Sequence, residues 1–179
     1  MYGCGEPWWG FYRSGRVRNF GYYHGFRYDV FAYYRGASVR AHVWAARQQA
    51  RDPNDKYKIA GAVPLPPKLE KTIVLFPGFT EFCEKYSKEV LRFHERGYNV
   101  LVIDWPGQGQ SGHFGWHPLA VHCDNFDHHI GAMDAVIEKA GLDGHDLILF
   151  GHSMGGHLAL RYAVWRAHDV KAVILSAPM

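Results

Sequence analysis

The serine at position 153 stands in a Gly-x-Ser-x-Gly pattern, Gly151-His152-Ser153-Met154-Gly155. An apolar run precedes this pattern, and apolar residues at helical spacing follow it. A serine in the tight turn between a strand and a helix has a strained backbone, with its hydroxyl exposed for attack on a carbonyl carbon. The sequence therefore predicts that Ser153 is a catalytic nucleophile in such a turn, called a nucleophile elbow.

The neighbours of Ser153 have distinct parts in this prediction. Gly151 and Gly155 flank the turn, where side chains would collide with the elements around it. The helix that follows directs free amide groups to the same place, so we expect the Met154 N–H to stabilise an oxyanion. His152 is expected to pack, because a residue adjacent to the serine cannot reach the hydroxyl proton.

An earlier loop is expected to provide a second donor for the oxyanion. The segment Phe76-Pro77-Gly78-Phe79-Thr80-Glu81 follows an apolar run, and its most suitable donor is the Phe79 N–H. Each such donor is typically worth about 10²-fold to 10³-fold in rate. The alternative interpretation is a turn that ends a strand and has no catalytic part.

Four short apolar runs dominate the sequence after residue 70, with helix-length segments between them. Each is apolar at consecutive positions, as in parallel strands that are covered by helices on both faces. The runs lie at 72–76, 99–104, 146–151 and 171–177. They predict an α/β fold with a mostly parallel sheet.

Three segments have apolar residues at helical spacing. The first spans 84–96 and stops at Gly97, and the second is capped by Asp124 and ends near Gly141. The third runs from about 154 to 167, and the residues expected on its buried face are Leu158, Tyr162 and Trp165.

The N-terminal third of the chain is organised differently. Residues 1–25 have neither helical nor strand periodicity and are expected to form an irregular lead-in to a domain at 26–179. Aromatic and β-branched residues at 26–45 predict a hairpin that turns near Gly36. The proline-rich segment 48–68 is expected to be a surface loop.

Three segments, FPGFTEFCEKY, VIDWPGQGQSG and GHSMGG, followed by LSAPM, resemble the lysophospholipase and monoacylglycerol lipase-like branch of the α/β-hydrolase superfamily. The resemblance spans 26–179. It implies an α/β-hydrolase fold, hydrolysis of small-molecule or lipid acyl esters through an acyl-enzyme, and no cofactor. By the same resemblance Ser153 is the nucleophile, and Phe79 and Met154 are the oxyanion residues.

The segment 104–111, which resembles a loop of the family, contains an acidic residue and a departure from the family's pattern. Asp104 precedes the serine, whereas the family's triad acid follows it in the chain, so we assign Asp104 to loop architecture. Pro106 stands where many relatives carry Arg, which removes any salt bridge made from that position.

After Ser153 the chain offers only Asp169 as an acid and His157 and His168 as bases. His157 lies one turn into the following helix, and the other two lie at the opposite end of the sheet. The sequence is therefore expected to be truncated at its C-terminus, before the cap and the last strands, and to lack the triad acid and histidine. We expect this chain alone to be inactive or nearly so, with 171–177 as an exposed, aggregation-prone edge.

Two alternative functions remain open. One is a non-catalytic hydrolase-like fragment or partner-binding pseudoenzyme. The other is a metal-binding module, although Gly115 and Pro118 interrupt its helix and its spacings match no zinc pattern. The residues of that module would be His113, His117, His122, Cys123, Asp124, His128 and His129.

Charge and cysteine content indicate which partners and which cellular location to expect. Residues 1–51 carry eight Arg, no Lys and two acidic residues, a net +6 that suits a solvated surface or a peripheral contact with anionic lipid or an acidic partner. No nucleic-acid motif accompanies this charge. Three widely spaced cysteines, no secretory signal and no membrane-spanning run indicate a cytoplasmic protein, with membrane association left open.

Overall fold

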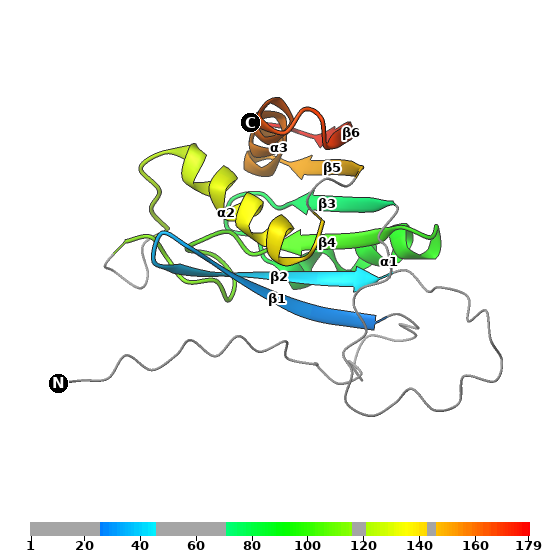
Figure 1. Ribbon diagram of the computed structural model, residues 1–179, viewed down its shortest axis with the longest axis horizontal. Helices are drawn as coiled ribbons and strands as arrows, with labels where there is room; N and C mark the ends of the chain where they lie inside the picture. Colours follow the sequence, from blue (N-terminus) through cyan, green and yellow to red (C-terminus); the bar gives the residue numbers. More distant parts are fainter. Residues whose placement is uncertain (1–25, 46–70, 116–120, 143–145) are drawn as a thin grey trace.

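The computed structural model describes residues 26–45, 71–115, 121–142 and 146–179. These residues form one six-stranded sheet in the order β1-β2-β4-β3-β5-β6 (Figure 1). The predicted lead-in at 1–25 and the predicted loop at 48–68 lie outside the described residues.

The predicted hairpin is confirmed at one edge of this sheet. Strands β1 (Phe26–Tyr34) and β2 (Ala37–Ala45) pair antiparallel, and the turn between them uses positive φ at Arg35 and Gly36. Strand β2 then pairs antiparallel with β4, so the hairpin extends the parallel part of the sheet.

The four apolar runs form the parallel part of the sheet, as predicted. They are β3 (Thr72–Phe76), β4 (Asn99–Ile103), β5 (Leu147–His152) and β6 (Val170–Ser176). Strand β3 lies in the centre, with β4 and β5 as its neighbours, and β6 lies beyond β5. The carboxyl ends of β3, β4 and β5 therefore lie at the same end of the sheet, and the loops that follow these strands build the candidate site there.

Helices cover both faces of the sheet. On one face lie the short 3₁₀ helix η1 (Cys83–Tyr86) and α1 (Ser87–Glu95); on the other lie α2 (Phe126–Lys139) and α3 (Met154–Trp165). Alternate residues of β3 serve the two cores, because Ile73 and Leu75 pack toward α1 while Val74 and Phe76 pack toward α2 and α3. This arrangement explains the consecutive apolar positions in the sequence.

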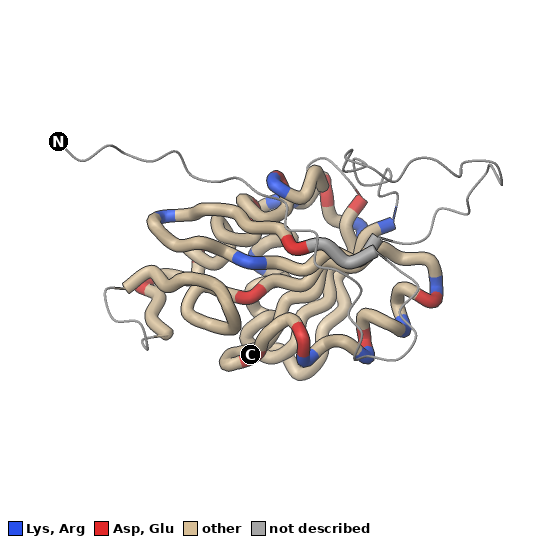
Figure 2. Tube along the Cα trace, turned by 90° about the horizontal axis from the view of Figure 1, so that it is seen from below, with Lys and Arg blue, Asp and Glu red and all other residues tan. Residues whose placement is uncertain are grey.

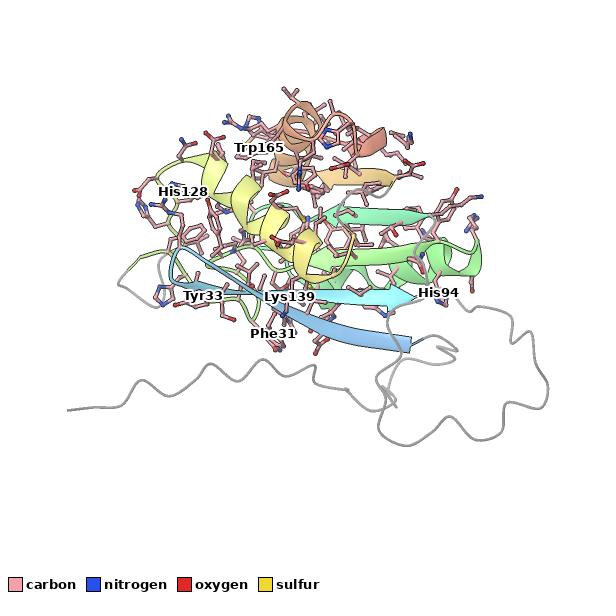
Figure 3. The ribbon with its side chains drawn as sticks, viewed as in Figure 1. Phe31, Tyr33, His94, His128, Lys139 and Trp165 are labelled. Atoms are coloured by element: carbon pink, nitrogen blue, oxygen red, sulfur yellow. The ribbon has the colours of Figure 1, made fainter. Side chains whose placement is uncertain are left out.

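Two predicted details of the helices are wrong. Asn125, not Asp124, caps α2, and its side chain accepts a hydrogen bond of 2.9 Å from the Asp127 N–H. Trp165 does not lie on the buried face of α3 with Leu158 and Tyr162, since 55% of it is exposed (Figure 3). It is the last residue of the helix and lines a surface pocket together with Leu160 and Val164.

Surface properties follow from this layering. Basic and acidic residues are interspersed along the described chain (Figure 2). Within the described ranges, no helix is long and apolar enough to cross a membrane. At the β6 edge, Ile174 and Leu175 are 43% and 38% exposed, so the last strand presents apolar side chains to solvent.

Candidate active site

Ser153 occupies the turn between β5 and α3, where its backbone has φ of 51° and ψ of −123°. A positive φ is strained for a residue with a side chain. The glycines on both sides allow the turn: a Cβ at Gly151 would lie 2.5 Å from the Gly155 carbonyl oxygen, and a Cβ at Gly155 would collide with the carbonyl oxygens of Phe76 and Pro77. Both glycines thus have a steric reason at this turn.

Backbone hydrogen bonds from the end of β6 hold this turn. The Ser153 N–H donates to the Ser176 carbonyl oxygen at 3.1 Å, and the Met179 N–H donates to the Ser153 carbonyl oxygen, also at 3.1 Å. His152 Nδ1 lies 3.0 Å from the same Ser176 oxygen, which can only accept, so Nδ1 carries the proton. His152 thus ties the ends of β5 and β6 together, within the packing role expected of it.

The loop at Pro77–Phe82, which we call the oxyanion loop, lies directly against the elbow. A Cβ at Gly78 would be 3.3 Å from the Ser153 Cβ. The next residue, Phe79, is 54% exposed, and its N–H has no hydrogen-bond partner within the described part of the chain. Met154 begins α3, so its N–H has no acceptor within the helix. The two predicted oxyanion donors therefore come from segments that flank Ser153.

A buried carboxylate folds the oxyanion loop back on itself. Glu81 is 7% exposed, and its Oε2 accepts the Gly78 N–H at 2.7 Å and the Tyr86 hydroxyl, while Oε1 accepts Lys85 Nζ. Burial raises the pKa of this carboxyl, but the hydrogen bonds from Lys85, Tyr86 and Gly78 outweigh it and bring the pKa below its ordinary value. The Glu81 N–H in turn donates to Gln108 Oε1 at 3.1 Å.

Asp104 has the structural role that its place in the sequence suggested. Its fully buried carboxylate accepts from Arg40 Nε and from the Cys83 N–H, both at 2.7 Å, and from the Gln110 N–H at 2.9 Å. A side chain at Gly109, which has φ of 56°, would collide with this carboxylate. Asp104 therefore joins β2, η1 and the loop after β4.

Sequence reasoning missed four residues that build these loops. Arg40 stands outside any motif, whereas Glu81, Glu84 and Gln108 lie in segments whose family resemblance gave these three residues no part in the site. Arg40 also reaches the Glu84 carboxylate at 3.0 Å, 44 residues away in the chain. The sequence shows only that residues of opposite charge are present. It does not show which of them form ion pairs in the fold.

No acid–base partner for Ser153 lies within the described residues. The Ser153 hydroxyl makes no side-chain hydrogen bond there. The His157 ring packs against the Phe126 ring, tilted by 55° with a centroid distance of 5.0 Å. His168 and Asp169 precede β6, at the opposite end of the sheet from the elbow, and His168 Nε2 lies 3.4 Å from Asp169 Oδ2. Among the described residues, none of these three side chains makes a hydrogen bond to the Ser153 hydroxyl.

The histidine-rich segment forms pairs. His122 Nε2 lies 2.7 Å from Asp124 Oδ1, and His129 Nδ1 lies 3.0 Å from Cys123 Sγ. Burial lowers the pKa of His129 to about 4 and raises the pKa of the Cys123 thiol, so both are neutral at pH 7. His117 lies outside the described ranges, and within them no three His, Cys, Asp or Glu side chains could hold a metal ion.

Comparison with known proteins supports a hydrolase. The family model described as Hydrolase_4, serine aminopeptidase S33, matches residues 67–179. The chain is 32% identical over 112 residues to a probable lysophospholipase L2 of Haemophilus influenzae, covering 62% of this chain and 35% of the relative. It is 29% identical over 108 residues to a monoacylglycerol lipase of Mycolicibacterium smegmatis, covering 60% of this chain and 37% of that one.

Solved structures agree on the fold. The thioesterase domain from the curacin biosynthetic pathway matches with a TM-score of 0.62 at 23% identity, over 84% of this chain and 46% of that one. The chain spans between 33% and 39% of the length of the bacterial phospholipases and lysophospholipases that it matches.

Proposed function

Because the chain belongs to the serine aminopeptidase S33 family of α/β-hydrolases, in its lysophospholipase and monoacylglycerol lipase-like branch, we propose that it forms the nucleophile-bearing part of an acyl-ester hydrolase. The observation that carries the proposal is the strained backbone at Ser153, with the oxyanion loop packed against it. A protein maintains such strain where a function depends on it.

In the proposed reaction the Ser153 hydroxyl oxygen attacks the ester carbonyl carbon and loses its proton to a base. The carbonyl oxygen becomes an oxyanion, which the Met154 and Phe79 N–H groups stabilise. The C–O bond to the alcohol then breaks, the alcohol takes up a proton, and an acyl-enzyme remains. Water hydrolyses this ester and returns the proton to Ser153.

The proposed substrates are lipid acyl esters of glycerol or glycerophospholipids. Relatives named lysophospholipase and monoacylglycerol lipase support this class. The exposed aromatic rings of Phe79 and Phe82, 54% and 44% accessible, would provide apolar contacts for an acyl chain beside the elbow. We also propose a peripheral contact with a membrane surface, because lipid acyl esters are located there.

The polypeptide 1–179 by itself is expected to turn over slowly or not at all. Ser153 has no base among the described residues, and a serine hydrolase without its acid–base groups retains only about 10³-fold to 10⁴-fold acceleration over water. The absence of a base near Ser153 also favours the second candidate function, a non-catalytic hydrolase-like fragment that binds a partner.

Acylation by p-nitrophenyl butyrate distinguishes the acyl-ester hydrolase from the non-catalytic fragment. Imidazole added to the assay can supply the missing base. We expect a burst of up to one equivalent of p-nitrophenol that imidazole accelerates, and a butyryl group on the peptide that contains Ser153. Deacylation also needs a base, so turnover after the burst should be slow without imidazole. Lysophosphatidylcholine and a monoacylglycerol should then compete with the chromogenic ester.

Two serine variants control this experiment. Ser153→Ala should show no burst, whereas Ser87→Ala on α1 should behave as the unmodified chain. A burst of equal size in Ser153→Ala would contradict the nucleophile assignment. A folded chain that gives no burst even with imidazole would support the non-catalytic alternative.

A further inference from the structure

The oxyanion loop leaves a small number of its backbone N–H groups free. The Gly78 N–H is taken by Glu81 Oε2 and the Glu81 N–H by Gln108 Oε1. Pro77 has no N–H. In the described part of the chain, the N–H groups of Phe79, Thr80 and Phe82 have no acceptor. Of these three residues, Phe79 adjoins Gly78, where a Cβ would lie 3.3 Å from the Ser153 Cβ.

The Glu81 carboxylate accepts a hydrogen bond from one backbone amide of the loop, the Gly78 N–H. It is buried and accepts hydrogen bonds on both oxygens, with the Gly78 N–H and the Tyr86 hydroxyl meeting at the same atom, Oε2. The chain between these groups is short, because Glu81 follows Gly78 by three residues, and Thr80 has a positive φ of 61° within it. The loop is therefore a tight turn in which the Pro77–Gly78 peptide has a fixed direction, and the Phe79 N–H lies on the next peptide along the chain.

We propose that Glu81 is a positioning residue for the reaction: its carboxylate holds the Gly78 N–H and thereby turns the Phe79 N–H toward the oxyanion that forms at Ser153. This inference rests on the proposed function. Without the acceptor, the Gly78 N–H would be buried and unpaired, and the Pro77–Gly78 peptide would rotate to find a partner and move the adjoining Phe79 N–H with it. A displacement of about 1 Å at such a donor can cost about 10²-fold in rate.

Three substitutions at Glu81 distinguish its role as a hydrogen-bond acceptor from the effect of its negative charge. Glu81→Ala removes the acceptor, and Glu81→Met removes it while keeping the length and apolar volume of the side chain. Glu81→Gln keeps one oxygen, and because Gly78 and Tyr86 share Oε2, a single oxygen placed there preserves both bonds. Only the contact with Lys85, a 57% exposed side chain, is lost in the glutamine variant. The matched control is Glu95→Gln at the exposed end of α1.

The readout compares acylation by p-nitrophenyl butyrate with acylation by its thiono analogue, in which C=S replaces C=O, both with imidazole. Sulfur is a weak hydrogen-bond acceptor, so an oxyanion donor favours the oxygen ester. We expect Glu81→Ala and Glu81→Met to lower the oxygen-ester rate by about 10²-fold and the thiono-ester rate far less, so that the ratio of the two rates falls. Glu81→Gln and Glu95→Gln should keep the ratio within about threefold of the unmodified chain.

An equal loss on both esters in the acceptor-free variants would overturn the proposal, because partial unfolding lowers both rates together. A glutamine variant as defective as the alanine variant would overturn it as well. If Glu81→Ala fails to fold, Glu81→Met gives the same ratio test, and circular dichroism of each variant verifies the fold. Acylation that persists in Ser153→Ala would instead overturn the proposed function, so the two failures are distinguishable.

Discussion

Asp104 shows how a single buried charge can hold several loops. Its carboxylate is 0% exposed and bonds Arg40, which is 3% exposed, so the pair is shielded from water. Removal of one partner from such a pair leaves the other charge buried and uncompensated, which typically costs about 3–5 kcal/mol. The stability of the candidate site therefore depends on a residue that takes no part in the proposed chemistry.

Asp104→Asn tests this dependence. We expect the free energy of unfolding to fall by about 3 kcal/mol or more, because Arg40 then keeps only the partly exposed Glu84 as a charge partner. Urea titration followed by circular dichroism measures the change. Asp124→Asn is the control, since that side chain is 77% exposed, and a loss at Asp104 no larger than at Asp124 would refute the expectation.

His129 predicts acid sensitivity. Burial is the main cause, and the neighbouring His128 a lesser one, of a pKa lowered from 6.5 to about 4. The unfolded chain therefore binds a proton at higher pH than the native chain does, so stability is lost as pH falls from 6.5 toward 4. The shift corresponds to a loss of about 3 kcal/mol. Urea unfolding at several pH values should show a shallower loss over this window in His129→Gln.

The residues of the candidate site differ in how far sequence could predict them. Ser153, Met154 and the elbow glycines stand together in the chain, so a local pattern identifies them. Glu81 has its role only because Gly78, Tyr86 and Gln108 surround it in space. A carboxylate in a loop reads as a solvated charge until its partners are known.

At the scale of elements, the cap of α2 is a clear case where sequence and structure differ by one residue. Asp124 and Asn125 are both favourable caps, and propensity alone does not choose between them. The structure chooses Asn125, whose side chain bonds the Asp127 N–H, while Asp124 pairs with His122. The hydrophobic pattern locates the helix, but only the backbone angles locate its end.

Asn125→Ala is expected to destabilise the chain by about 1 kcal/mol, the usual cost of losing a side-chain cap. Asp124→Ala should change the free energy of unfolding far less, because its pair with His122 is exposed. Urea denaturation of both variants at pH 7 gives the comparison. Equal losses in the two variants would show that the cap belongs to neither residue alone.

The strands follow from sequence more closely than the helix ends do. Consecutive apolar residues are needed wherever helices cover both faces, and two separate cores meet that condition at β3 and β4. The same reasoning failed for Trp165, because a periodic pattern does not show whether the last residue of a helix has a packing partner.

At the scale of the whole molecule, apolar side chains gather at one side of the sheet. Leu160, Val164 and Trp165 on α3 are 46%, 83% and 55% exposed, and Ile174 and Leu175 on β6, a strand that contacts α3, are 43% and 38% exposed. Exposed apolar surface beside an unpaired strand edge favours association between chains. The predicted poor solubility would originate here.

The double variant Val164→Lys, Ile174→Lys is expected to raise the soluble fraction and to reduce self-association, as measured by light scattering of the purified chain. Tyr33→Lys adds the same kind of charge on β1, at the other edge of the sheet, where 62% of Tyr33 is exposed (Figure 3). A gain of equal size from Tyr33→Lys would mean that net charge, rather than this surface, governs solubility.

The central position of β3 has a consequence for how the chain is made. During synthesis β3 emerges before both of its neighbours, β4 at 99–103 and β5 at 147–152. The edge of β3 that pairs with β5 therefore keeps its N–H and C=O groups unpaired until more than forty further residues beyond β4 have left the ribosome. Nascent chains expose such edges to one another. We expect this interval of translation to be the one in which a chaperone, or slower elongation, most improves the yield of folded protein.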